Sequence, residues 1–290
     1  MKVAGFTIAR NVIRYDYPIR EAILSVLPLV DRFFIAVGKS EDDTLNFIRS
    51  IDPVKIEILE TEWDDNLREG GKVLSIETNK AFELIPEEYD YAFYIQGDEV
   101  LHEKYIEEVK QQMQKWKNEK SVQGLLFSYT HFYGTYEYIG DSRRWYRNEI
   151  RIIKNDKQIR SYKDAQGFRT ADNKKLRVKK INAEIFHYGW VKPPKAQQEK
   201  QNNFHKMWHD DEWVKKNVSK SDNFDYSQID SLKKFSGTHP AIMNERIKNQ
   251  DWDFIYDERK IKRSMKDKIL NIITKVTGWI PGEYKNYKII

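Results

Sequence analysis

The sequence contains no cysteine in its 290 residues and no long apolar run. The lack of cysteine excludes disulfides, thiolate metal sites and cysteine nucleophiles, and it fits a reducing compartment. A membrane-spanning helix needs roughly 18 apolar residues, whereas the stretch 23–30 is short and contains Pro28. Residues 1–8 hold one lysine and too short an apolar run for a signal peptide, so we predict a strand there. We therefore expect a cytoplasmic protein.

A large excess of one charge is also missing from most of the chain. The formal net charge of +5 comes from 50 Lys and Arg against 45 Asp and Glu. Residues 259–275 contain seven basic residues and one acid, so the rest of the chain has 43 basic and 44 acidic residues. A nucleic-acid-binding protein needs a basic face for phosphate contacts. The near-neutral body therefore argues against nucleic acid as a partner.

The remaining composition is that of a folded protein. Hydrophobic residues at 40% and aromatic residues at 13% rule out wholesale disorder, and 33% charged residues indicate a very polar surface. A chain of this size is expected to bury roughly three quarters of its surface on folding. The length allows one large domain or two small ones.

Strand-like and helix-like patterns alternate over the first 115 residues. Pro18 suits the first turn of a helix, and Ile19, Ile23 and Leu27 continue that helix as an apolar stripe. The predicted strands are 2–9, 32–37, 54–60 and 91–95, and the predicted helices begin near residues 18, 44, 72 and 102. This order predicts a parallel sheet with right-handed crossovers, whose ligands bind at the carboxyl ends of the strands. The loops 9–16, 38–43, 61–71 and 96–101 are therefore expected to converge.

The second half of the chain changes character. Short strand candidates lie at 125–129, 145–147, 150–154 and 184–188, without regular alternation with helices. Residues 195–255 are rich in Lys, Asn, Gln, Asp and Trp and are predicted to form helices and loops packed on the sheet. We predict an α/β fold with a Rossmann-type mixed sheet over residues 1–205 and a helical C-terminal extension over 206–290.

Two adjacent acids, Asp98 and Glu99, follow the predicted strand 91–95. Such a carboxylate pair can hold Mg²⁺ or Mn²⁺ together with phosphate oxygens. The same acids equally suit the cap of a helix that starts near His102. In the preceding loop, Gly71 and Lys72 begin a helix, where free N–H groups and the helix dipole suit a phosphate, although the spacing is not that of a P-loop.

Other polar positions have both a chemical and a structural explanation. The segment Ala9-Arg10-Asn11 is a ligand-binding loop or an ordinary turn, and His187 is a metal ligand or a core histidine. Asp164 is a general base or a turn residue. His205 and His209 lie four residues apart but lack the glutamate of a zincin motif, so we expect surface histidines.

Taken in order, these residues resemble glycosyltransferase family 2, which contains nucleotide-sugar enzymes of the GT-A fold, and in particular its bacterial cell-surface polysaccharide and lipopolysaccharide members. The matching positions are Ala9-Arg10-Asn11, the loop with Ser40, Asp42, Asp43 and Thr44, the helix with Lys72 and Asn79, the metal-loop-like Gln96-Gly97-Asp98-Glu99, and Phe186-His187-Tyr188-Gly189. The resemblance covers residues 2–205. Two positions depart from the family, because Gln96 replaces the first Asp of the metal loop and Gly38 replaces an Asp that often contacts the nucleotide base.

The resemblance implies an inverting, metal-dependent transfer of a sugar from a nucleoside-diphosphate sugar to a hydroxyl of a saccharide or lipid-linked envelope glycan. It implies the following roles: Mn²⁺ or Mg²⁺ held by Asp98, Glu99 and His187; the donor bound by Ala9, Arg10, Asn11, Lys72, Gln96 and Asp98; and Asp164 as the catalytic base. The two departures leave open a non-catalytic carbohydrate- or polyanion-binding protein on a degenerate GT-A scaffold.

The basic segment near the C-terminus has an apolar stripe at helical spacing. Ile261, Met265, Ile269, Ile272 and Val276 form this stripe, with basic residues mostly between them. A basic amphipathic helix over 259–276 would lie on the anionic inner face of the cytoplasmic membrane. The stripe would equally pack on the domain and leave its Lys and Arg side chains in water.

Overall fold

The structure is a computed structural model that describes residues 1–218, 221–257, 269–270, 274, 276–277 and 281–290. The predicted basic helix over 259–276 lies almost wholly outside the described residues. In the described part of the chain, none of the helices is both long and apolar enough to cross a membrane.

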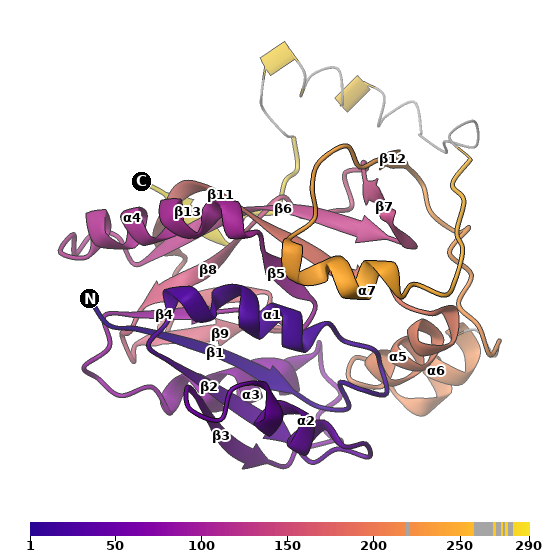
Figure 1. Cartoon of the computed structure of the whole chain (residues 1–290), viewed down its shortest axis with the longest axis horizontal. Helices are drawn as coiled ribbons and strands as arrows, with labels where there is room; N and C mark the ends of the chain where they lie inside the picture. Colours follow the sequence, from indigo (N-terminus) through magenta and orange to yellow (C-terminus); the bar gives the residue numbers. More distant parts are fainter. Residues whose placement is uncertain (219–220, 258–268, 271–273, 275, 278–280) are drawn as a thin grey trace.

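The centre of the molecule is a mixed sheet with the strand path β12-β7-β6-β8-β4-β1-β2-β3, and β11, β5 and β13 branch from it (Figure 1). Its strands are β1 (Val3–Ala9), β2 (Arg32–Gly38), β3 (Ile56–Thr61), β4 (Tyr91–Tyr94), β5 (Glu99–Leu101), β6 (Gly124–Tyr133), β7 (Thr135–Gly140), β8 (Asn148–Lys154), β11 (Leu176–Trp190), β12 (Leu232–Lys234) and β13 (Tyr287–Ile289). A separate antiparallel hairpin consists of β9 (Ile159–Tyr162) and β10 (Gly167–Thr170). The helices are α1 (Ile19–Val26), α2 (Thr44–Ile51), α3 (Lys72–Glu83), α4 (Ile106–Trp116), α5 (Pro194–Lys206), α6 (Asp211–Asn217) and α7 (Asn244–Lys248), with 3₁₀ turns at Leu27–Leu29, Glu103–Tyr105 and Ala241–Met243.

The N-terminal half is the predicted parallel unit. β1 pairs in parallel with β2 and β4, and β2 pairs in parallel with β3. Successive side chains alternate between two cores, because a strand points them to opposite faces. Phe33 and Ile35 pack with α1, α2 and α4, whereas Phe6 and Phe34 pack with α3 on the other face. Burial on both faces explains why these strands appear as continuous apolar runs.

The second half adds antiparallel strands. β8 pairs antiparallel with β4 and β6, and β11 runs parallel to β6 along most of its length. The predicted strand at 145–147 is wrong, because these residues lie in the loop between β7 and β8. There the Trp145 indole packs against Gly140, where any side chain would clash with it. The fold class is therefore the predicted mixed α/β arrangement of the GT-A type.

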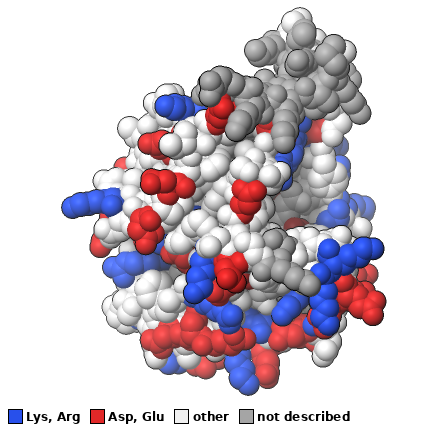
Figure 2. Space-filling model, turned by 90° about the vertical axis from the view of Figure 1, so that its right-hand side faces the viewer, with Lys and Arg blue, Asp and Glu red and all other residues white. Residues whose placement is uncertain are grey.

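The segment after residue 205 contributes to the same sheet. β12 pairs antiparallel with β7, and β13 pairs in parallel with β11, while α6 and α7 are short. The domain boundary at residue 205 stays a prediction. On the face shown in Figure 2, side chains of both signs are interspersed over the described residues.

Candidate active site

A cavity of about 460 Å³ opens at the carboxyl ends of the parallel strands. Its walls come from the loops after β1, β3 and β4, the β9–β10 turn, the end of β11 and α5. The predicted site residues that line it are Ala9, Arg10, Gln96, Asp98, Asp164 and His187. Of the other predicted residues, Asn11, Lys72 and Glu99 do not line it. Three of the four strand-end loops therefore converge as expected.

The loop 38–43 supports the cavity from behind. The backbone N–H of Asn11 donates to Ser40 Oγ at 3.0 Å, and Asn11 Oδ1 accepts from the Glu41 N–H at 2.7 Å. The Val12 N–H donates to Thr44 Oγ1 at 2.9 Å. Asn11, with a left-handed φ of 52° and 2% exposure, thus holds the turn together. The Asn11 side chain therefore stabilises the loop from which Arg10 and Val12 reach the cavity.

One end of the cavity offers a guanidinium and an indole. Asp65 fixes Arg10 through two contacts, Nη1–Oδ1 at 2.6 Å and Nη2–Oδ2 at 3.1 Å. The Arg10 guanidinium lies 5.5 Å from the centre of the Trp63 ring. Gly38 packs against this indole, and a side chain there would clash with it. Trp63 therefore occupies the space of the aspartate that the family resemblance would place at position 38.

The centre of the cavity holds Asp98 with a buried lysine. Lys200 Nζ lies 3.2 Å from Asp98 Oδ2 and donates to the Gly189 carbonyl at 3.0 Å. His187 Nε2 lies 3.8 Å from Asp98 Oδ1. A Cβ atom on Gly189 would come within 2.7 Å of both Asp98 and His187, so only glycine permits this approach. Burial opposes ionisation of Asp98, but the charge of Lys200 beside it outweighs burial and holds the pKa of Asp98 well below its usual range.

A second histidine fixes which nitrogen His187 presents to Asp98. His131 Nε2 lies 2.7 Å from the Tyr146 carbonyl, which can only accept a hydrogen bond, so this nitrogen carries a proton. Burial lowers the pKa of His131 to about 3, and the neutral ring leaves Nδ1 as an acceptor. His131 Nδ1 lies 3.1 Å from His187 Nδ1, which must then be the donor. Burial also lowers the pKa of His187, so its Nε2 carries a lone pair beside Asp98.

Glu99 lies beneath the cavity. Its oxygens accept from Arg151 Nε and Nη2, both at 2.7 Å, and both side chains are 0% exposed. The Tyr129 hydroxyl and the Gln96 N–H also donate to this carboxylate. Because every position around the carboxylate is taken, the structure does not bring Glu99 to a metal ion in the cavity. The prediction of Glu99 as a metal ligand needs this correction: β5 turns its side chain into the core.

The β9–β10 turn carries Asp164 into the cavity. Lys163 and Ala165 on either side have left-handed φ values of 55° and 61°, a strained conformation that recurs at functional sites. Gln96 Nε2 donates to the Ala165 carbonyl at 3.2 Å, which the aspartate expected at position 96 could not do. Burial raises the pKa of Asp164.

The start of α3 is built differently from the predicted phosphate site. Lys72 is exposed and lies outside the cavity wall. The Gly71 N–H already donates to the Met207 carbonyl at 3.2 Å, and Arg68 pairs with Asp211. His205 was expected at the surface but is half-buried in the cavity wall.

Sequence reasoning missed several cavity residues. Lys200 and Phe204 come from α5, whose polar sequence gives no signal that separates them from surface residues. Tyr17 follows the loop after β1, and Lys192 and Lys200 lie 4.2 and 4.8 Å from its ring centre. The Pro193–Pro194 pair after β11 predicts a helix start, and this was the one signal that could have placed α5 next to the site.

Comparison with known proteins gives distant structural similarities. No family model matches the chain, and no curated protein does. Staphylococcus aureus TarS 1–349 in complex with UDP is 14% identical with a TM-score of 0.37, over 70% of this chain and 64% of TarS. Glucosyl-3-phosphoglycerate synthase from Mycobacterium tuberculosis, solved with Mn²⁺, UDP and phosphoglyceric acid, is 18% identical with a TM-score of 0.29, over 45% and 43%. A 4-diphosphocytidyl-2C-methyl-D-erythritol synthase from Anaerococcus prevotii is 8% identical with a TM-score of 0.33, over 53% and 70%.

The chain spans less than two thirds of the length of the TarS and glucosyl-3-phosphoglycerate synthase structures. Similarity at this level assigns neither a reaction nor a substrate to the chain.

Proposed function

We propose that the protein is a glycosyltransferase that binds a nucleoside-diphosphate sugar in the 460 Å³ cavity and transfers the sugar to a hydroxyl group with inversion. The observation that carries this proposal is the convergence of Asp98, His187, Lys200 and Asp164 on one cavity at the carboxyl ends of parallel strands. This is the edge at which open α/β sheets bind their ligands. The cavity holds positive groups that can bind a diphosphate and a carboxylate that can accept a proton.

Asp98 and His187 suit a divalent cation, and Glu99 does not. The fixed tautomer of His187 points a lone pair toward the ionised Asp98, and such a pair repels unless a cation lies between the two groups. No group of three His, Cys, Asp or Glu side chains suits a metal in the described residues. Mg²⁺ and Mn²⁺ commonly take one or two protein ligands and complete their shell with phosphate oxygens and water. When bound, the cation would neutralise charge that develops on the departing diphosphate.

The chain's own residues supply the remaining roles. Lys200 is a buried ammonium beside Asp98, positioned to hold a diphosphate oxygen. Arg10 lines the same cavity, and its Nε has no partner among the described residues. Asp164 accepts the proton of the acceptor hydroxyl, and its raised pKa makes it a better base than an exposed carboxylate.

Calorimetry with a panel of nucleoside-diphosphate sugars and Mn²⁺ tests donor binding. We expect one donor to bind the wild type, and Asp98→Asn to weaken that binding at least about tenfold, as for loss of a charge-assisted contact. Asp172→Asn, at an exposed acid that does not line the cavity, is the control. Unchanged affinity in Asp98→Asn would contradict the assignment of Asp98.

Asp164→Asn separates a catalyst from a binding protein. We expect this variant to keep donor affinity and lose about 100-fold or more in turnover, the usual contribution of general-base catalysis. Near-wild-type turnover would point to another base. Donor binding without transfer or hydrolysis by the wild type would favour the non-catalytic alternative.

A further inference from the structure

A second cavity, of about 620 Å³, lies next to the first. It occupies a gap along the edge of β6, between Ser128, which pairs with Asn148 of β8, and Phe132, which pairs with Ile139 of β7. The loop 141–147 forms one side of this gap, and the segment around β13 forms another.

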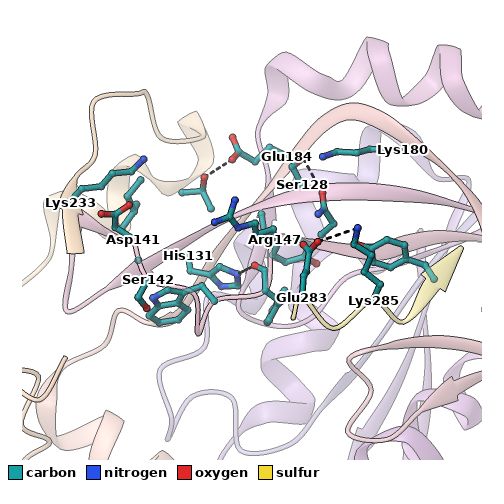
Figure 3. A pocket seen from close by; sticks show the side chains of 18 of the residues that line it. Ser128, His131, Asp141, Ser142, Arg147, Lys180, Glu184, Lys233, Glu283 and Lys285 are labelled. Atoms are coloured by element: carbon teal, nitrogen blue, oxygen red, sulfur yellow. Dashed lines mark hydrogen bonds and ion pairs between the residues drawn. The ribbon is translucent and has the colours of Figure 1, made fainter. Parts of the chain in front are cut away.

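Three cations of this cavity have no ion-pair partner. Figure 3 shows Arg147 near the middle, with Lys233 to one side and Lys180 to the other. All three are exposed, and none forms a salt bridge with any residue in the described part of the chain.

The acids of the second cavity are already engaged. Glu184 accepts from the Thr130 hydroxyl, and Lys285 lies 3.3 Å from Glu283. Asp141 is not free either. Glu184 keeps its charge because its partner is a neutral hydroxyl. The lining nevertheless holds four cations, Arg147, Lys180, Lys233 and Lys285, against three acids, and this positive excess suits a phosphate or carboxylate.

The two cavities are neighbours and share a lining residue. Tyr146 lines both of them. His131 lines the second cavity, and its Nδ1 contacts His187 in the wall of the first. Trp145 lies in the same wall of the second cavity and offers an aromatic surface of the kind that stacks on sugar rings. A saccharide held here would lie next to the donor cavity.

We propose that the second cavity binds the acceptor, and that this acceptor is a saccharide bearing an anionic group, phosphate or carboxylate, which Arg147, Lys180 and Lys233 recognise. The proposal rests on the proposed function, since a two-substrate transfer needs an acceptor site adjacent to the donor. It adds the charge of the acceptor, which the donor cavity leaves undefined.

Calorimetry on the full chain with matched oligosaccharides tests the site. The probes are mannopentaose, mannopentaose 6-phosphate and a galacturonate oligomer, so the last two distinguish phosphate from carboxylate. We expect one anionic probe to bind at least about tenfold more tightly than mannopentaose, and Arg147→Gln to remove about tenfold of that affinity. Lys180→Gln and Lys233→Gln should cause smaller losses. Lys39→Gln, at an exposed lysine that lines neither cavity, is the control.

Equal affinity for neutral and anionic probes, or an unchanged affinity in Arg147→Gln, would overturn the proposal. Donor affinity measured on the same variants keeps the two proposals apart. If a nucleoside-diphosphate sugar binds wild type and Arg147→Gln alike while the anionic probes fail, only the acceptor site is wrong. If the anionic probe binds through Arg147 and no sugar nucleotide binds, the site stands and the glycosyltransferase assignment fails.

Discussion

Asp98 and Glu99 are neighbours in the sequence, but their carboxylates lie in opposite surroundings. Asp98 lines the first cavity, of about 460 Å³, beside Lys200 and His187, with one oxygen near each. Glu99 is fully buried, and Arg151 binds both of its oxygens. The rings of Tyr94 and Tyr129 each lie 5.3 Å from the Arg151 guanidinium.

This difference follows from the backbone. Asp98 lies in the turn before β5, whereas Glu99 is the first residue of that strand and has its side chain in the core. One carboxylate is therefore available to a ligand, and the other fixes the position of the loop. A motif that resembles a pair of metal ligands therefore contributes one carboxylate to the cavity and one to a structural ion pair.

Replacing Arg151 should have the largest effect, and it acts on stability. Arg151→Met leaves Glu99 as a buried charge without its partner, so we expect a loss of about 3–5 kcal/mol in the free energy of unfolding. Urea denaturation monitored by circular dichroism measures this loss. The double variant Glu99→Gln/Arg151→Met should recover part of it, because the uncompensated charge is gone. A loss below about 1 kcal/mol in the single variant would mean that water reaches the Glu99–Arg151 ion pair.

The same measurement on Asp98→Asn makes the comparison quantitative. Asp98 borders a cavity that admits water, so Lys200 can be hydrated when its partner is neutralised. The side chains of Lys200 and Asp98 are largely buried, at 13% and 11% exposure, so we expect a loss of about 1–3 kcal/mol, smaller than that of Arg151→Met because water can reach the charge left behind. A loss as large as that of Arg151→Met would erase the distinction between the two carboxylates.

Glu149 provides a third buried carboxylate, this time without a cation bound to it. Burial raises the pKa of Glu149 to about 8, although Arg151 nearby and the Gln166 amide oppose the shift. Between its ordinary pKa of 4.5 and this value, the folded protein binds a proton that the unfolded chain does not. The free energy of unfolding should therefore fall as the pH rises through this window.

Glu149→Gln removes this proton equilibrium and should flatten the profile. Urea denaturation at about pH 5 and pH 8 should show the wild type losing roughly 3 kcal/mol relative to the variant, since each unit of pKa shift corresponds to about 1.4 kcal/mol. Parallel pH profiles for the two proteins would show that Glu149 is ionised when folded.

Replacing His131 tests whether Asp98 and His187 bind a cation. His131→Phe removes the acceptor that fixes the tautomer of His187. We expect affinity for Mn²⁺ in the presence of the donor, measured by electron paramagnetic resonance, to fall about 10–100-fold. Nitrogen NMR of His187 should show a loss of the Nδ1–H tautomer.

His239→Phe is the control for this variant, because His239 also contacts a backbone carbonyl but lies away from the cavity. Unchanged Mn²⁺ affinity in His131→Phe would mean that the tautomer does not matter for the cation.

The alternation of strands and helices in the first half and the convergence of three strand-end loops could be predicted, but the surroundings of the two adjacent acids could not. β1 and β2 are continuous apolar runs with clear breaks after them, and α2 is amphipathic. Strand ends in a parallel sheet meet at one edge whatever the side chains are. The position of Glu99 depends on a three-residue strand and on Arg151, which is 52 residues away in the sequence. Lys200 reaches the cavity only through the packing of α5.

The smallest effect should come from Gln96, and it concerns the loop shared by both carboxylates. Gln96→Glu keeps the shape of the side chain but removes the donor to the Ala165 carbonyl, so we expect a loss of about 1 kcal/mol in unfolding free energy. Because this bond supports the turn with Asp164, turnover should fall several-fold while donor affinity changes little. Gln201→Glu, in the wall of the same cavity, controls for added negative charge. If Gln96 instead contacted the donor, as the family resemblance implies for its position, affinity would fall more than turnover, and the loop would serve the ligand through two side chains rather than through Asp98 alone.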